Sequence, residues 1–149
     1  DSSVSDEPGL ETVEEISPSF SLELARRLAG RFLLAVDDRG RIWYVDPESL
    51  QRYEVNYRTV LNLFIKTSLG ITNKNLSKVP LTEQKFLSNQ LGNKLKGRIL
   101  LQTEEYGKTW YVDFTGVRHS ITIDNIIEVA KKFILGISNE HLNKIQKTQ

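Results

Sequence analysis

Leu-Ala-Gly-Arg-Phe-Leu-Leu-Ala-Val-Asp-Asp-Arg-Gly-Arg-Ile-Trp-Tyr-Val-Asp, residues 28–46, decides the fold because a close copy of this stretch occurs later in the chain. The copy, residues 95–113, reads Leu-Lys-Gly-Arg-Ile-Leu-Leu-Gln-Thr-Glu-Glu-Tyr-Gly-Lys-Thr-Trp-Tyr-Val-Asp. Ten of the nineteen aligned positions are identical at a constant offset of 67 residues. Similarity at a fixed offset indicates a duplicated structural unit. The sequence therefore predicts two related units that fold alike.

The repeated stretch has the pattern of a β-hairpin. Residues 31–36 and 41–46 form two apolar runs around a turn that contains Gly40, and Gly107 occupies the same place in the copy. Glycine takes the positive φ angles that such turns need. A third short strand follows at residues 52–55, or 118–121 in the copy. Because the first strand has apolar residues on both faces, we expect layers on both sides of it.

Helical patterns flank each hairpin. We expect a first helix from Ser19 or Ser21 to Ala29, and its counterpart from Thr82 or Glu83 to Gly97. An amphipathic helix follows at residues 59–68, and its counterpart is expected to be capped by Asp124. Both should stop at a glycine, Gly70 or Gly136, before a short last helix capped by Thr72 or Ser138. The predicted class is α+β: a tandem duplicated unit, each copy with a helix, a three-stranded antiparallel β-meander and C-terminal helices.

The duplication predicts that the chain has three parts: an acidic arm at residues 1–18, a first unit at 19–80 and a second unit at 81–149. Residues 1–20 carry six acids and no base, whereas the rest of the chain has a net charge of +7. Leu10, Val13, Ile16 and Phe20 give the arm an apolar side. Such an arm can fold back on its own body, bind a neighbouring copy or stay solvated.

Composition narrows the class of protein. The 149 residues contain no cysteine, which excludes disulfides and cysteine metal sites, and no apolar run is long enough to span a membrane. The chain lacks methionine and begins with Asp1, so we expect processing, for example by removal of a signal for export.

Several motifs together resemble a known sequence repeat. They are Gly-Arg-Phe-Leu-Leu-Ala-Val, Gly-Arg-Ile-Trp-Tyr-Val-Asp-Pro and Leu-Gly-Ile-Thr-Asn-Lys-Asn-Leu-Ser-Lys-Val-Pro. The chain resembles an uncharacterised tandem repeat of predicted exported or cell-envelope proteins from candidate-phylum bacteria. This resemblance implies an envelope or extracellular setting and carries no catalytic residues. The second copy departs from it, with Phe114 in place of Pro47 and His119 in place of Tyr53.

The paired aromatic residues of the hairpins are the main candidate ligand or interface residues: Trp43, Tyr44, Trp110 and Tyr111. They could stack on sugars, or they could pack in the core. Burying one Trp removes about 150–250 Å² from water, which is about 4–6 kcal/mol, whereas a stacking contact gives about 1–3 kcal/mol. Core packing is therefore favoured for small units, although Trp and its neighbouring Tyr should point to opposite faces.

Arg31 and Arg98 follow the repeated glycine and are further candidates. An ion pair at the strand edge, with Asp46 or Asp113, is the expected role, and a ligand contact is the alternative. The turn acids at residues 37–38 and 104–105 lack the alternating pattern of a calcium loop.

No pattern indicates an enzyme or a metal site. The two histidines, His119 and His141, have no histidine at the matching position of the first copy, and neither a phosphate-binding loop nor a nucleophile motif is present. The lysines and arginines are scattered, without a nucleic-acid-binding motif. We therefore expect no cofactor, no metal, no nucleic-acid partner and no membrane span.

The favoured hypothesis is a non-enzymatic extracellular or cell-surface structural or protein-interaction protein. Its expected partners are copies of itself, in a filament or lattice, or other envelope proteins. A module that binds cell-wall glycan is the alternative, and an enzyme would require a pocket with convergent polar groups.

Overall fold

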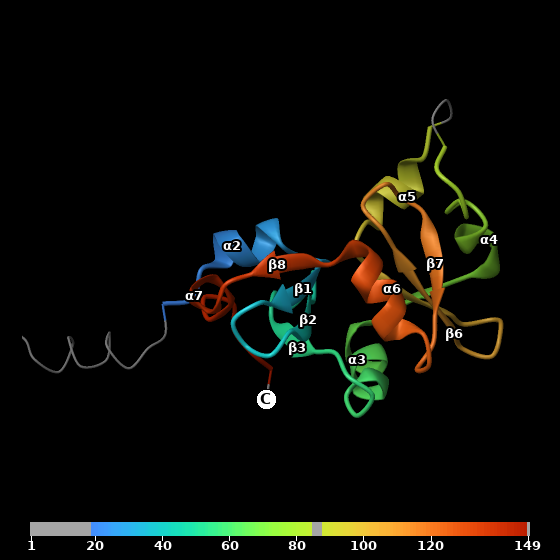
Figure 1. Cartoon of the computed structure of the whole chain (residues 1–149). Helices are drawn as coiled ribbons and strands as arrows, with labels where there is room; N and C mark the ends of the chain where they lie inside the picture. The colour runs from blue at the N-terminus through green and yellow to red at the C-terminus, as the bar shows by residue number, and fades with distance from the viewer. Residues whose placement is uncertain (1–18, 85–87, 149) are drawn as a thin grey trace, which may run out of the picture.

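The computed structural model describes residues 19–84 and 88–148, and the fold is α+β. The first copy supplies α2 (Leu22–Arg27), β1 (Phe32–Ala35), β2 (Arg41–Val45), β3 (Arg52–Glu54), α3 (Val60–Thr67), β4 (Leu69–Ile71) and α4 (Asn73–Leu76). The second supplies α5 (Gln90–Lys94), β5 (Ile99–Gln102), β6 (Lys108–Val112), β7 (Arg118–Ile121), α6 (Ile126–Phe133), β8 (Leu135–Ile137) and α7 (Asn139–Leu142). Figure 1 shows α2 and α7 at one end of the molecule and α4 and α5 at the other.

Each copy forms the predicted antiparallel meander, β1-β2-β3 or β5-β6-β7. The expected turn glycines, Gly40 and Gly107, have φ angles of +69° and +73°. Glycine adopts this conformation without a steric penalty, so the turns can close between strands that pair along their length.

Each meander gains a fourth strand from the other copy. β4 pairs in parallel with β5, and β8 pairs in parallel with β1, giving sheet orders of β3-β2-β1-β8 and β4-β5-β6-β7. The prediction that Gly70 and Gly136 end helices was wrong, because both lie inside these exchanged strands. A Cβ on Gly70 would lie 3.3 Å from the side chain of Thr103, a tight contact, so there is little room for a side chain at this position of the strand.

The expected helix starts were right in part. Ser21, Thr72 and Ser138 each accept a hydrogen bond from a backbone N–H of the helix that follows them. However, α5 does not begin at Thr82 or Glu83; it is capped by Asn89, whose side chain accepts from the N–H of Gly92 at 3.0 Å. The residue before α6 is Asn125 rather than Asp124. The sequence pattern therefore identified three capping residues. It did not identify which of several neighbouring polar residues precede α5 and α6 in the second copy.

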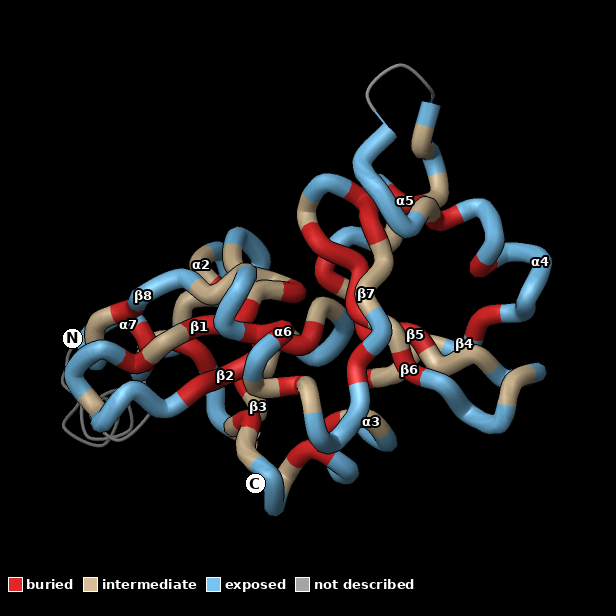
Figure 2. Tube along the Cα trace, turned by 45° about the vertical axis from the view of Figure 1, so that its right-hand side comes forward, coloured by how far each residue is buried: buried red, intermediate tan, exposed pale blue. Residues whose placement is uncertain are grey.

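The core has three parts, and both faces of each sheet are covered (Figure 2). The central cluster combines both copies, because α3 and α6 lie between the two sheets and pack with Phe32, Tyr44 and Tyr111. Two outer clusters lie beyond it, one around Trp43 and α7 and one around Trp110 and α4. Neither copy therefore builds its core alone.

The proposed arm residues Leu10, Val13 and Ile16 lie outside the described residues. Phe20 is described and is 41% exposed. In the part of the chain that the structure describes, no helix has the length and apolar character that crossing a membrane requires.

Candidate functional site

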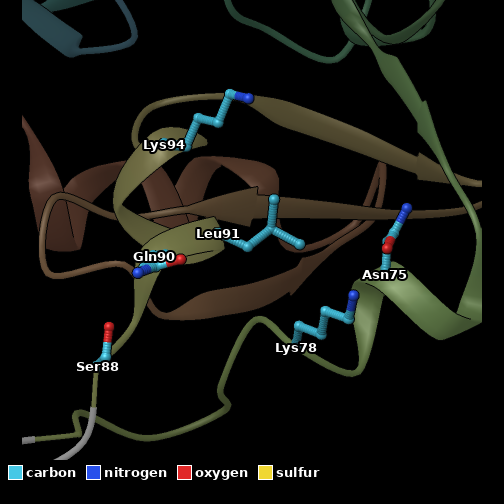
Figure 3. Close-up of a pocket in the computed structure, with 6 residues that line it drawn as sticks. All are labelled: Asn75, Lys78, Ser88, Gln90, Leu91 and Lys94. Carbon is cyan, nitrogen blue, oxygen red and sulfur yellow. The ribbon is translucent and has the colours of Figure 1, made fainter.

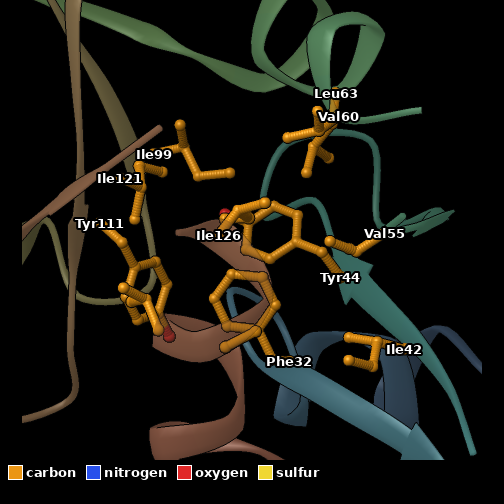
Figure 4. Packing of buried hydrophobic residues seen from close by; sticks show 12 residues of the cluster. Phe32, Ile42, Tyr44, Val55, Val60, Leu63, Ile99, Tyr111, Ile121 and Ile126 are labelled. Carbon is orange, nitrogen blue, oxygen red and sulfur yellow. The ribbon is translucent and has the colours of Figure 1, made fainter. Parts of the chain in front are cut away.

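The two repeated tyrosines meet at the centre of the molecule, where the copies join. The hydroxyl of Tyr44 donates a hydrogen bond to the carbonyl oxygen of Gly97, and that of Tyr111 donates to Gly30 at 2.9 Å. The ring of Phe32 lies 5.2 Å from the Tyr44 ring and 4.8 Å from the Tyr111 ring, between centroids (Figure 4). Each copy thus satisfies a backbone carbonyl of the other, and both phenols are part of the interface.

The backbones of the repeated glycines lie against each other at this centre. A Cβ on Gly30 would lie 2.5 Å from the Cα of Gly97, and a Cβ on Gly97 would lie 2.7 Å from the Cα of Gly30. Both residues have φ angles of +79°. Glycine is therefore required at these positions for two reasons. It allows the turn that follows the first helix of each copy, and it allows the two copies to approach closely.

Burial makes both central phenols weaker acids. Desolvation, together with the nearby Tyr111 and Asp46, raises the pKa of Tyr44 well above its usual value. Desolvation likewise raises the pKa of Tyr111. Both groups remain neutral hydrogen-bond donors through the physiological range, which suits a structural role.

The repeated tryptophans lie under arginine side chains. The guanidinium of Arg52 lies 4.2 Å from the ring centroid of Trp43, which is 4% exposed. Arg118 lies in the same way 4.3 Å from Trp110, which is half-buried. One face of each indole is therefore covered by a cation of its own chain.

The same arginines hold the exchanged segments. Nε of Arg52 donates to the carbonyl of Ile145 at 2.9 Å, and Nε of Arg118 donates to that of Val79 at 2.8 Å. Their burial lowers the pKa of both groups, although a guanidinium keeps its charge in proteins. Each arginine thus joins a β-meander to the segment that follows the strand donated by the other copy.

Arg31 and Arg98 reach across the junction between the copies. Arg31 lies over the ring of Phe114 at 3.6 Å, and Arg98 pairs with Glu48 at 3.1 Å. The expected ion pair is thus present for Arg98, but its partner is Glu48, and among the described residues neither arginine pairs with Asp46 or Asp113. Those aspartates instead accept hydrogen bonds from their own loops.

Asp113 and His119 form the closest acid–histidine pair of the described chain. Oδ2 of Asp113 lies 2.7 Å from Nε2 of His119, whose ring also packs on Phe133. Burial alone would raise the pKa of Asp113, but hydrogen bonds from Thr115, His119 and Val117 outweigh it and lower the pKa. This pair fixes the loop between β6 and β7, and within the described residues no group of three acids or histidines could hold a metal ion.

An open groove of about 610 Å³ lies between α4 and α5, at the end of the molecule opposite α2 (Figures 1 and 3). Its walls carry Lys78 and Lys94, with the half-buried Leu91 between them, and its other lining residues are Asn75, Ser88 and Gln90. None of these residues was among the candidate site residues predicted from the sequence. A signal was present, because Lys94 matches Arg27 of the first copy and Lys78 matches Lys144 of the second, whereas Gln90 replaces Glu23.

A second, more apolar groove lies beside β6 and β7. It is lined by Phe64 of α3, by Trp110 and by Ile123, together with polar residues such as Lys108 and Ser120. Neither groove contains histidine or a carboxylate among its lining residues.

The chain gave no match to a family model, to a curated protein or to a solved structure.

Proposed function

We propose that this protein is a non-enzymatic structural subunit that assembles with copies of itself through its acidic N-terminal arm. The observation that carries the proposal is the separation of charge: six acids and no base in residues 1–20, against a net charge of +7 in the remainder. Opposite charges on separate surfaces favour association and orient the partners. The extracellular or cell-surface setting is part of the proposal and is supported by the resemblance of the repeat to envelope proteins.

The position of the arm supports a head-to-tail contact. The arm joins the body at residue 19, beside α2, and α2 lies at one end of the molecule (Figure 1). A contact between the arm of one copy and a different surface of the next is heterologous, so it generates an open chain unless a ring closes. The arm and the basic body together supply the two unlike surfaces that such a chain needs.

Binding of cell-wall glycan, the alternative, has less support from the geometry. Sugars would have to stack on exposed aromatic faces, but Arg52 and Arg118 cover Trp43 and Trp110. The central tyrosines, Tyr44 and Tyr111, are fully buried. The residues proposed for glycan binding thus serve the core and the junction between the copies.

Sedimentation velocity and electron microscopy of the purified protein test the proposal. The full chain should form concentration-dependent oligomers or filaments at low salt, and a variant lacking residues 1–18 should remain monomeric. A control with the arm acids changed to Gln or Asn keeps the length and should also stay monomeric, because the charge is lost. Assembly of the truncated protein at the level of the full chain would contradict the proposal.

A further inference from the structure

We propose that the groove between α4 and α5 is the acceptor site for the acidic arm of a neighbouring copy. This inference rests on the proposed function and adds the location of its second surface. It identifies the occupant as residues 1–18 of another molecule of the same chain.

The chemistry of the groove suits an acidic peptide with apolar residues. Lys94 is the last residue of α5 and Lys78 follows α4, and both side chains border the opening shown in Figure 3. Both lysines are exposed, and within residues 19–84 and 88–148 neither forms an ion pair. Leu91 offers an apolar surface between them. The arm provides the complement, with Glu11, Glu14 and Glu15 interleaved with apolar positions.

The opposite end of the molecule, where α2 of the first copy lies beside α7 of the second, shows what closes the corresponding place. There the backbone N–H of Ser21 donates to the carbonyl of Lys144 at 2.8 Å, which joins the start of α2 to the end of α7. At the matching place, between α4 of the first copy and α5 of the second, the open groove lies beside Lys78 and Ser88. The same repeat is therefore closed at one end of the molecule and open at the other.

Charge also differs between the two ends. Around the closed end, Arg27 and Lys144 correspond to Lys94 and Lys78, but Glu23 is present as a local acid. In the open groove Gln90 takes the place of that acid, so no lining residue neutralises the two lysines. Because the charges of these two lysines are not balanced within the groove, an acidic segment is a suitable ligand for it, and the acidic arm at residues 1–18 is such a segment.

The geometry favours a neighbour as the source of the arm. The groove and the point where the arm joins the body lie at opposite ends of the molecule in both views of the chain (Figures 1 and 2). An arm that leaves one end can enter the groove of the next molecule without crossing its own body. Repetition of this contact gives the open head-to-tail chain of the proposed function.

Charge reversal in the full-length protein tests the site. The variant K78E/K94E should weaken self-association by about tenfold or more, since two ion pairs become repulsive. The matched control R27E/K144E changes the corresponding residues at the other end of the molecule, beside α2 and α7, and should assemble as the unmodified chain does. A second change in the arm, E11K/E14K/E15K, should restore assembly to K78E/K94E. Circular dichroism checks that each variant folds.

Mixing two deficient variants identifies the direction of the contact. A chain without residues 1–18 keeps the groove, and K78E/K94E keeps the arm, so together they should form a one-to-one complex that does not grow. Absence of that complex would overturn the assignment to a neighbouring copy, and so would an arm that binds within its own molecule. If removal of the arm abolishes assembly but K78E/K94E behaves like R27E/K144E, the groove is wrong while the proposed function stands. If removal of the arm changes nothing, both are wrong.

Discussion

Replacing Gly30 by Ala should test the close approach of the two copies. The change has two costs: alanine is strained at a φ of +79°, and its Cβ would lie 2.5 Å from the Cα of Gly97. The backbone strain is about 1–2 kcal/mol. Overpacking against atoms that cannot move aside adds about 1–3 kcal/mol. Because the new Cβ would meet the backbone of Gly97 and not a flexible side chain, we expect little relaxation to reduce the overpacking penalty.

The chain supplies a control that separates the two costs. Gly40 also has a positive φ, +69°, but a Cβ there would meet only the side chain of Leu34, at an ordinary 3.7 Å. Gly40→Ala should therefore lose only the backbone part, about 1–2 kcal/mol. The second copy offers the same comparison with Gly97→Ala and Gly107→Ala, whose Cβ atoms would meet backbone and a leucine side chain, respectively.

Equilibrium unfolding in urea, followed by tryptophan fluorescence, measures these differences. Gly30→Ala should lower the free energy of unfolding by more than Gly40→Ala does, with little change in the dependence on urea. The same order should hold for Gly97→Ala and Gly107→Ala. Equal losses within each pair would refute the reasoning, because they would mean that the two glycine backbones do not meet in solution.

Three further predictions concern polar side chains that form hydrogen bonds within the fold. Tyr44→Phe and Tyr111→Phe should each lower the free energy of unfolding by about 1–3 kcal/mol, since a buried carbonyl loses its donor. Because folding raises the pKa of both phenols, the unmodified protein should lose stability above pH of about 10. Urea titrations should show a smaller loss of stability above this pH for each variant than for the unmodified protein. Folding lowers the pKa of Asp113, so its stabilising effect should be present above pH of about 4 and fade below it, and Asp113→Asn should flatten the acid side of the stability curve measured by urea unfolding at pH 2–6. Gln102→Ala should cost about 1 kcal/mol, because Gln102 accepts from Nε1 of Trp110 at 2.9 Å, and the fluorescence of the native state should change.

Local features of the fold could be predicted from the sequence. The repeated hairpins are recognisable because apolar runs flank a glycine turn, and the long amphipathic helices appear as α3 and α6. Caps at Ser21, Thr72 and Ser138 follow from side chains that accept hydrogen bonds within three residues. Each of these features depends on contacts between near neighbours in the chain, which a sequence pattern records.

The contacts of the candidate residues could be predicted only in part. Burial of Trp43 and Tyr44 on opposite faces follows from strand alternation, and the two residues lie in different clusters of the core. The partners of Arg31 and Arg98 could not be found in this way, because Phe114 and Glu48 belong to loops of the other copy. Such contacts depend on how the copies are placed against each other.

Strand exchange shows why a repeat in sequence does not fix a domain in space. β4 and β8 carry the same Leu-Gly-Ile sequence, and each would meet equivalent partners in its own sheet or in the other one. Local energies are therefore nearly the same for both arrangements. The arrangement of the strands is instead determined where helix and strand join. One residue separates α3 from β4, and one residue separates α6 from β8. Because α3 and α6 pack between the sheets, the strand that follows each helix is delivered to the opposite sheet. The central core thus determines the exchange, and the exchange in turn makes each copy depend on the other.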